Sequence, residues 1–240
     1  MFIRYDDRPM KPAARVIRSQ AIRHYRDADA SAPLSTLPDA EWALLAACAN
    51  SDWDVPADAS IPQLIAEQVC TNPDAVAVIV DGEEMSYAQL WTRAGAVAGG
   101  LRMAGVRLGH PVGLCCERST ELVIGMLGIL RAGAAYVPLD PAYSAERLTF
   151  MRKDIGMRVI VAQVGVPLPD GAYRAIVVDP EPAELGQPDA FGLLEDDPWA
   201  AGPDDLAYLS YPAGPGGTAP TVMASHRNVL SLLAGTRRYG

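Results

Sequence analysis

The sequence predicts an α/β fold, a layered parallel-type sheet with flanking helices. The strongest observation is a strand–helix–strand unit, in which two short apolar runs, PVGLCC at 111–116 and AAYVPL at 134–139, enclose an apolar helical stretch at 122–130. The polar residues 118–121 (RSTE) cap this helix with an acid in its first turn, and Gly133 stops it. Strands joined through a helix pair in parallel with a right-handed crossover.

The same alternation continues toward the C-terminus. Residues 145–154 predict a helix, and residues 157–163 and 173–178 predict strands. DLAYLSY at 205–211 is a further strand that leads into a glycine-rich turn, and Ser225 caps a last helix running to about residue 234. Strands and helices repeating in this order are typical of a layered α/β domain.

Two helices, a strand and a third helix precede this region. The segments 38–50 (PDAEWALLAACAN) and 62–70 have apolar residues at helical spacing. AVAVIV at 75–80 predicts a strand, and the stretch from 87 to about 103 predicts a helix whose three glycines favour close packing.

Composition and charge narrow the possible functions. The chain has 240 residues, of which 50% are hydrophobic and 20% charged, so it can bury the core of one large domain or two small ones. Its net charge of −9 is opposite to that of a typical nucleic-acid binder. The most apolar run, at 122–130, is too short to cross a bilayer, and no membrane segment is predicted.

The N-terminal residues differ in charge from the remainder. Residues 1–26 hold seven basic residues against Asp6 and Asp7. We therefore expect a basic arm at 1–33, either solvated or docked on a partner, with a mitochondrial-type presequence as the alternative interpretation. Residues 34–60 are linker-like, and residues 61–240 form the α/β domain.

The cysteines and histidines predict no metal site and no catalytic site. The four cysteines, at 48, 70, 115 and 116, lack metal-ligand spacing. They are interpreted as small apolar core residues of a protein in the reducing cytoplasm. The three histidines are far apart in the sequence and have no obvious carboxylate or cysteine partners.

The glycine-rich turn is the one local candidate for a ligand site. Residues 211–226 read YPAGPGGTAPTVMASH, and a glycine turn between a strand and a helix can present backbone N–H groups to a phosphate. The turn matches neither the Walker pattern nor GxGxxG, and a plain loop is the alternative. The candidate phosphate-contacting residues are Gly214, Gly216, Gly217 and Thr218.

Longer motifs resemble a known family. LRAGAAYVPLDPAYSAERLTFM at 130–151, MSYAQL at 85–90 and DLAYLSY with its turn stand in the order found in the adenylation domains of nonribosomal peptide synthetases, within the AMP-forming acyl and aryl ligases. A linker-like stretch at 37–68 also resembles the segment before that domain. Departures are few here, with Gln89 where Glu is usual and Ser144 where Pro is usual. The resemblance starts at about residue 34 and implies the N-terminal portion of the adenylation fold.

The turn departs further from the family, whose loop holds the phosphates of ATP with hydroxyls, N–H groups and a lysine. Gly214 and Gly217 match the family, but Pro220 stands where the lysine belongs. Proline, alanine or glycine replaces the hydroxyl residues at Pro212, Ala213, Pro215 and Gly216. The resemblance therefore implies a vestigial phosphate loop, and we expect ATP with Mg²⁺ to bind weakly or not at all.

The resemblance also implies that no catalytic residue can be assigned. The sequence ends at Gly240, and the family's amino-acid pocket, adenine contacts and catalytic lysine lie further along the chain. We expect a truncated adenylation-type domain that is inactive in acyl-adenylate formation by itself and needs no metal or other cofactor.

The function that fits these features is binding rather than catalysis. In the family, the region around AYSAERL resembles the surface on which small MbtH-like proteins dock, which makes Tyr143, Ala145 and Arg147 the candidate partner-binding residues. The alternative is that Ala145 only starts a helix. A carrier or synthetase module could instead contact the basic arm.

Two other functions stay open. The chain could be half of a split amino-acid-activating ligase that a second protein completes, or a synthetase fragment without a separate role.

Overall fold

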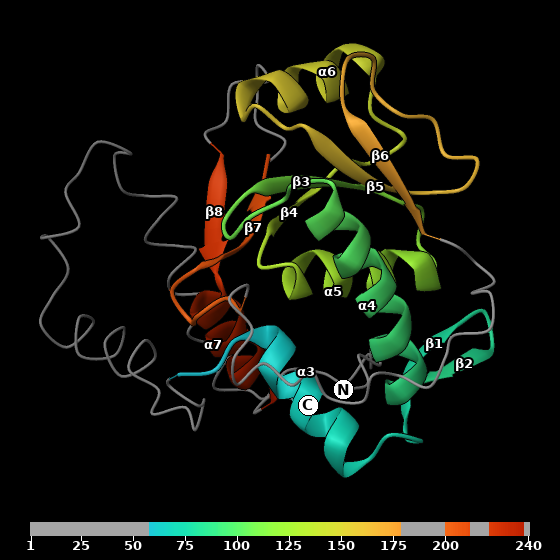
Figure 1. Cartoon of the computed structure of the whole chain (residues 1–240), viewed down its shortest axis with the longest axis vertical. Helices are drawn as coiled ribbons and strands as arrows, with labels where there is room; N and C mark the ends of the chain where they lie inside the picture. Colours follow the sequence, from blue (N-terminus) through green and yellow to red (C-terminus); the bar gives the residue numbers. More distant parts are fainter. Residues whose placement is uncertain (1–57, 179–199, 212–220, 238–240) are drawn as a thin grey trace, which may run out of the picture. The chain divides into compact units, whose positions relative to one another are not determined.

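A computed structural model describes residues 58–178, 200–211 and 221–237 (Figure 1). Residues 58–230 of this part belong to one compact unit, to which the account below refers. The end of helix α7 from Ser231 onward belongs to a second unit. The predicted arm at 1–33, the helix at 38–50 and Cys48 lie outside the described residues.

A six-stranded sheet organises the unit, with the strand order β6-β5-β3-β4-β7-β8. Five of its strands are parallel, and β8 is antiparallel to β7. The strands are β3 (Pro111–Cys115), β4 (Ala135–Pro138), β5 (Val159–Gln163), β6 (Arg174–Val178), β7 (Leu206–Ser210) and β8 (Val222–Ser225). A separate hairpin joins β1 (Val76–Val80) to β2 (Glu83–Ser86).

Helices cover both faces of the sheet, as the α/β prediction requires. The helices are α3 (Ile61–Thr71), α4 (Tyr87–Met103), α5 (Thr120–Arg131), α6 (Ala145–Asp154) and α7 (His226–Arg237). Helices α4 and α5 lie on one face, and α6 lies on the other (Figure 1). The connection from β3 through α5 leads to β4, toward the β8 end of the sheet, whereas the connection from β4 through α6 leads to β5, toward the β6 end. Because both crossovers are right-handed, α5 and α6 lie on opposite faces of the sheet.

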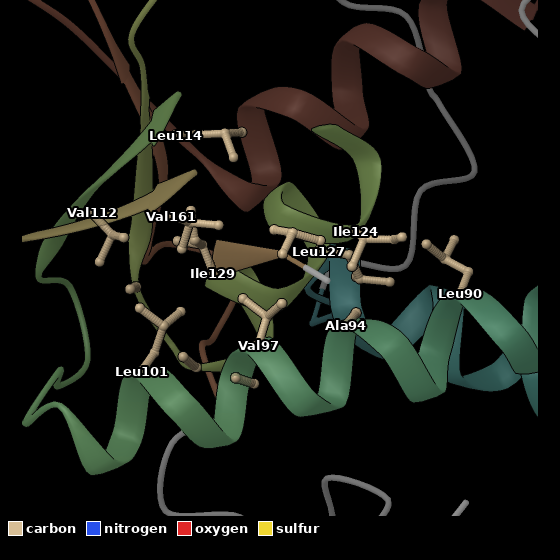
Figure 2. Packing of buried hydrophobic residues seen from close by; sticks show 14 of the residues in the cluster. Leu90, Ala94, Val97, Leu101, Val112, Leu114, Ile124, Leu127, Ile129 and Val161 are labelled. Carbon is tan, nitrogen blue, oxygen red and sulfur yellow. The ribbon is translucent and has the colours of Figure 1, made fainter. Parts of the chain in front are cut away.

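Successive side chains of a strand point to opposite faces of the sheet, so the core consists of two clusters, one on each face. On β3, Val112 and Leu114 face α4 and α5, whereas Cys115 faces the α6 side. Figure 2 shows the larger cluster, in which Leu101 and Val97 of α4 meet apolar side chains of α5 and the sheet. Burying each such side chain contributes about 1.5–3 kcal/mol, so this cluster is the main stabilising element of the unit.

Helices α4 and α5 pack closely because small residues line their contact. A Cβ atom built on Gly128 of α5 would lie 2.6 Å from the Cβ of Val97 and 3.0 Å from the carbonyl oxygen of Ala94. Arg131 of α5 stacks over the Trp91 ring, at 3.5 Å from its centroid, and donates a hydrogen bond to the Trp91 carbonyl. Glycine is therefore required at residue 128 by the space that α4 leaves.

We expect Gly128→Ala to lower the free energy of unfolding by about 1–3 kcal/mol, because the added methyl group meets α4 backbone and a branched side chain. Gly99→Ala in α4 is the matched control, since a Cβ there meets no atom within 4 Å. The control should raise stability by about 0.5–1 kcal/mol through helix propensity. Urea unfolding of both variants measures the difference, and equal effects of the same sign would contradict the close-packing argument.

Several details of the sequence prediction are corrected by the structure. Cys70 is exposed rather than part of the core, whereas Cys115 and Cys116 are buried as expected. Ser119 stands at the N-cap position of α5 but makes no cap bond; its hydroxyl donates to the Gln163 side chain at 3.3 Å. Strands β2 and β8 were not predicted, and β8 makes the sheet mixed rather than purely parallel.

Candidate functional site

The candidate site lies at the carboxyl edge of the sheet, where β4 and β7 end side by side. The two strands are parallel neighbours, with Tyr136 opposite Tyr208. After β3 the chain enters α5 on one face, and after β4 it enters α6 on the other. Such a change of direction between adjacent parallel strands is where α/β folds most often bind ligands. These neighbours are β3 and β4, so the turn that follows β4 lies at the expected place, and the residue that follows β7 lies on the adjacent strand.

Local hydrogen bonds fix the start of α6. The carboxylate of Asp140 accepts from the Ala142 N–H at 2.9 Å, and the Ser144 hydroxyl accepts from the Arg147 N–H at 3.3 Å. The pKa of Glu146 is lowered by its own backbone N–H and by the Ser144 hydroxyl. Serine in place of the family's proline thus supplies a cap, and Ala145 is the exposed first residue of the helix.

Arg147 connects α6 to the end of β7. Its guanidinium carbon lies 4.6 Å from the centroid of the Tyr143 ring, and its Nη2 donates to the Tyr211 carbonyl at 3.4 Å. The Nε atom of Arg147 is buried and has no hydrogen-bond partner among the described residues. The cation is therefore held between an aromatic ring and a backbone carbonyl.

Tyr211 is held by two further side chains of α6. Its hydroxyl donates to Asp154 at 2.7 Å, and its ring meets Phe150 edge-on at a centroid distance of 6.4 Å. Burial, together with the Asp154 hydrogen bond, raises the pKa of Tyr211 to about 12. Tyr211 is the last residue described before the glycine-rich turn, so α6 fixes the point from which that turn begins.

The structure describes only some of the predicted site residues. The structure places Arg147 over the Tyr143 ring at the start of α6 and leaves Ala145, the first residue of that helix, exposed. The phosphate-loop candidates Gly214, Gly216, Gly217 and Thr218 lie outside the described residues. The contacts of Phe150 and Asp154 with Tyr211 were missed, although residues 147, 150 and 154 share a helix face at i, i+3 and i+7.

The buried titratable groups Cys115, Cys116 and Glu121 lie outside the candidate site. Burial raises the pKa of Cys115 to about 11 and that of Cys116 to about 12, so neither thiol is a nucleophile at neutral pH. Burial acts to raise the pKa of Glu121, but hydrogen bonds from its own N–H and two hydroxyls, and the charge of Arg93 at 3.6 Å, outweigh this effect. The pKa of Glu121 is therefore lowered overall. The described ranges contain no cluster of side chains able to hold a metal ion.

A protein-family model decides the classification. The model described as AMP-binding enzyme matches residues 65–239. The chain belongs to this family. The resemblance to adenylation domains of nonribosomal peptide synthetases is confirmed, and the fold is the N-terminal part of that domain.

Similar proteins are much longer than this chain. Tyrocidine synthase 3 of Brevibacillus parabrevis is 36% identical over 185 residues, which are 75% of this chain and 3% of the relative. Gramicidin S synthase 2 of Brevibacillus brevis is 38% identical over 178 residues, 74% of this chain and 4% of the relative. The nonribosomal peptide synthetase FmoA3, solved with alpha-methyl-L-serine-AMP, matches with a TM-score of 0.66 and 24% identity, covering 94% of this chain and 25% of that one.

The membrane prediction can be checked for the described helices. None of them is both long enough and apolar enough to pass through a lipid bilayer.

Proposed function

We propose that this adenylation-type domain acts as a docking module within nonribosomal peptide biosynthesis, and that it does not activate an amino acid by itself. The observation that carries the proposal is the start of α6, where Arg147 contacts the Tyr143 ring and Ala145, the first residue of the helix, is exposed. The proposed occupant is a small protein of the MbtH-like type, which the family resemblance suggests.

The α6 surface has the features of a protein contact. Tyrosine and arginine are the residue types that most often dominate binding energy at interfaces. Here Tyr143 and Arg147 are already held by the contact between them and by Tyr211, so little side-chain freedom would be lost on binding. Ala145 leaves room for a partner side chain, and Phe150, which is 54% exposed, adds apolar area on the same helix.

The nucleotide part of the proposal rests on the chemistry of the glycine-rich turn. The residues present do not fit a triphosphate with Mg²⁺, because Pro212, Pro215 and Pro220 have no N–H to donate and none of them carries a hydroxyl or a charge. We therefore assign ATP no role in this chain and derive no chemical step through it.

Binding of a purified MbtH-like protein tests the docking function. Ala145→Glu should weaken binding by about tenfold or more, because a longer, charged side chain replaces the small methyl group and loses its water when the partner covers it. Glutamate is tolerated in the first turn of a helix, so the fold should persist. Calorimetric titration gives the affinity of each variant.

Ala96→Glu is the matched control, since Ala96 is also an exposed helical alanine and lies on α4 rather than on α6. The control should bind as the unchanged chain does. Absence of any binding by the unchanged chain, or equal weakening by both substitutions, would refute the docking assignment.

A further inference from the structure

Basic side chains gather at the sheet edge where β5 and β6 start. They come from three segments: the last turn of α6 (Arg152 and Lys153), the residue before β5 (Arg158) and the first residue of β6 (Arg174). The Arg174 N–H donates to the Arg158 carbonyl at 2.9 Å, and Arg152 Nη1 donates to the Ala172 carbonyl at 3.5 Å. These bonds place the four cations, named the basic patch, on neighbouring segments.

Described carboxylates balance only part of the charge of the basic patch. Asp154 follows Lys153 in the sequence and keeps its negative charge while it accepts a hydrogen bond from Tyr211. Burial and the charge of Asp170 raise the pKa of Tyr173, and Arg152 of the basic patch acts on the same tyrosine in the opposite direction. Within the described ranges, Lys153, Arg158 and Arg174 are exposed and make no ion pair. Four cations against these two carboxylates leave a net positive cluster on a chain whose net charge is −9.

Helix electrostatics explain only part of this cluster. Cations favour the last turn of a helix, which accounts for Arg152 and Lys153. Arg158 and Arg174 precede or begin strands, so no helix dipole calls for them. Neither side chain makes an ion pair within the described ranges, and their positive charges are therefore available to an external partner.

An exposed apolar side chain lies at the same edge of the sheet as the basic patch. Ile176 of β6 packs against Gly100 of α4. The end of α4 and the start of β6 lie at the same edge of the sheet, because α4 ends shortly before β3 starts and β3 runs parallel to β6. Arg174 on β6 is closer to that edge than Ile176, and Met103 on α4 is closer to it than Gly100. Met103 is 82% exposed, the largest exposed fraction among the large apolar side chains described.

We propose that the basic patch and Met103 form a second docking surface, which binds an acidic segment of a partner protein that also carries apolar side chains. The surface lies at the end of α6, about 10–12 Å along the helix axis from Ala145, so it is separate from the first docking surface. It does not depend on the proposed function. Exposed charges mainly accelerate association and select the sign of the partner, and the apolar contact adds affinity.

The test uses the whole chain and a short fluorescein-labelled peptide that alternates glutamate with leucine, with binding followed by anisotropy at low salt. Arg158→Glu and Arg174→Glu should each weaken binding by roughly three- to tenfold, as should Met103→Ser. Arg118→Glu is the matched control, because it changes the net charge equally at an exposed loop position on the opposite edge. It should leave the affinity nearly unchanged.

Two results would overturn the proposal. Equal weakening by Arg118→Glu and Arg158→Glu would mean that the peptide senses only the overall charge. A single-stranded oligonucleotide that binds as tightly as the peptide, with the same sensitivity to Arg158→Glu and none to Met103→Ser, would indicate a general polyanion surface. Thermal melts that match the unchanged chain exclude misfolding of the variants as the cause.

Discussion

ATP with Mg²⁺ is expected to bind this chain with a dissociation constant in the millimolar range or weaker. The family's loop uses several hydroxyls and one lysine, and this turn has proline, alanine or glycine in their place. Losing neutral hydrogen bonds at about 1 kcal/mol each and a charged one at about 1.5–3 kcal/mol removes roughly 4–6 kcal/mol. That free energy corresponds to a loss of about 10³–10⁴ in affinity. Calorimetric titration measures it directly.

Restoring the family's side chains should recover part of this affinity. Pro220→Lys alone should tighten ATP binding by about tenfold or more, because it returns the charged hydrogen bond. Adding Pro212→Thr, Ala213→Ser and Pro215→Ser should increase the gain further. The substitutions start from a defined point, since Asp154 and Phe150 of α6 hold Tyr211 immediately before the turn. His110→Lys, an added cation far from the turn in sequence, is the control and should change nothing.

Amino-acid-dependent exchange of pyrophosphate into ATP is the companion measurement. The unchanged chain should show none by itself. Micromolar ATP binding, or robust exchange with or without a partner protein, would contradict the interpretation of a vestigial phosphate loop. Exchange only in the presence of a second protein would favour the split-ligase alternative over a docking module.

The fold could be predicted well where local signals and tertiary packing agree. Helix α6 begins and ends where residues 145–154 predicted, because Ser144 caps it and Gly156 adopts a positive φ of 62° after it. The capping box of Ser86 and Gln89 likewise fixes the start of α4. Glutamine in place of the family's glutamate still accepts the Ser86 N–H, at 2.8 Å.

Pairing between distant segments could not be predicted. Strand β8 is short and its Val222 and Met223 are largely exposed, so no alternation marks it; only its antiparallel pairing with β7 makes it a strand. The link from Arg147 to the Tyr211 carbonyl spans 64 residues of sequence. Resemblance placed Tyr143, Ala145 and Arg147 on one surface, but nothing in the residues themselves indicated that Tyr211 would lie against the same helix.

Acid is expected to destabilise the chain through His226, beginning near pH 6.5, before carboxylates are protonated. His226 is 0% exposed, and its Nδ1 accepts a hydrogen bond from the Ile61 N–H at 3.2 Å, which links the start of α3 to the start of α7. Burial lowers the pKa of His226 to about 4, against the opposing effect of nearby Asp205. The start of α7 also disfavours an imidazolium through the helix dipole.

The sign of the pH effect follows from proton linkage. The unfolded chain binds a proton at His226 below its ordinary pKa of 6.5, whereas the folded chain does not until about 4. The contribution of His226 to the free energy of unfolding is therefore fully present above pH 6.5 and decreases as the pH falls from 6.5 to 4. At about 1.4 kcal/mol for each pKa unit, the full loss is roughly 3 kcal/mol.

His226→Asn separates titration from the hydrogen bond, because an asparagine oxygen can take the place of Nδ1 and accept the Ile61 N–H without binding a proton. Urea unfolding between pH 6.5 and 4.5 should show a slope for the unchanged chain and a nearly flat profile for this variant. His226→Leu should be flat but less stable by about 1–3 kcal/mol at neutral pH, since the Ile61 N–H loses its acceptor. A variant that keeps the slope of the unchanged chain would place the acid sensitivity in another group.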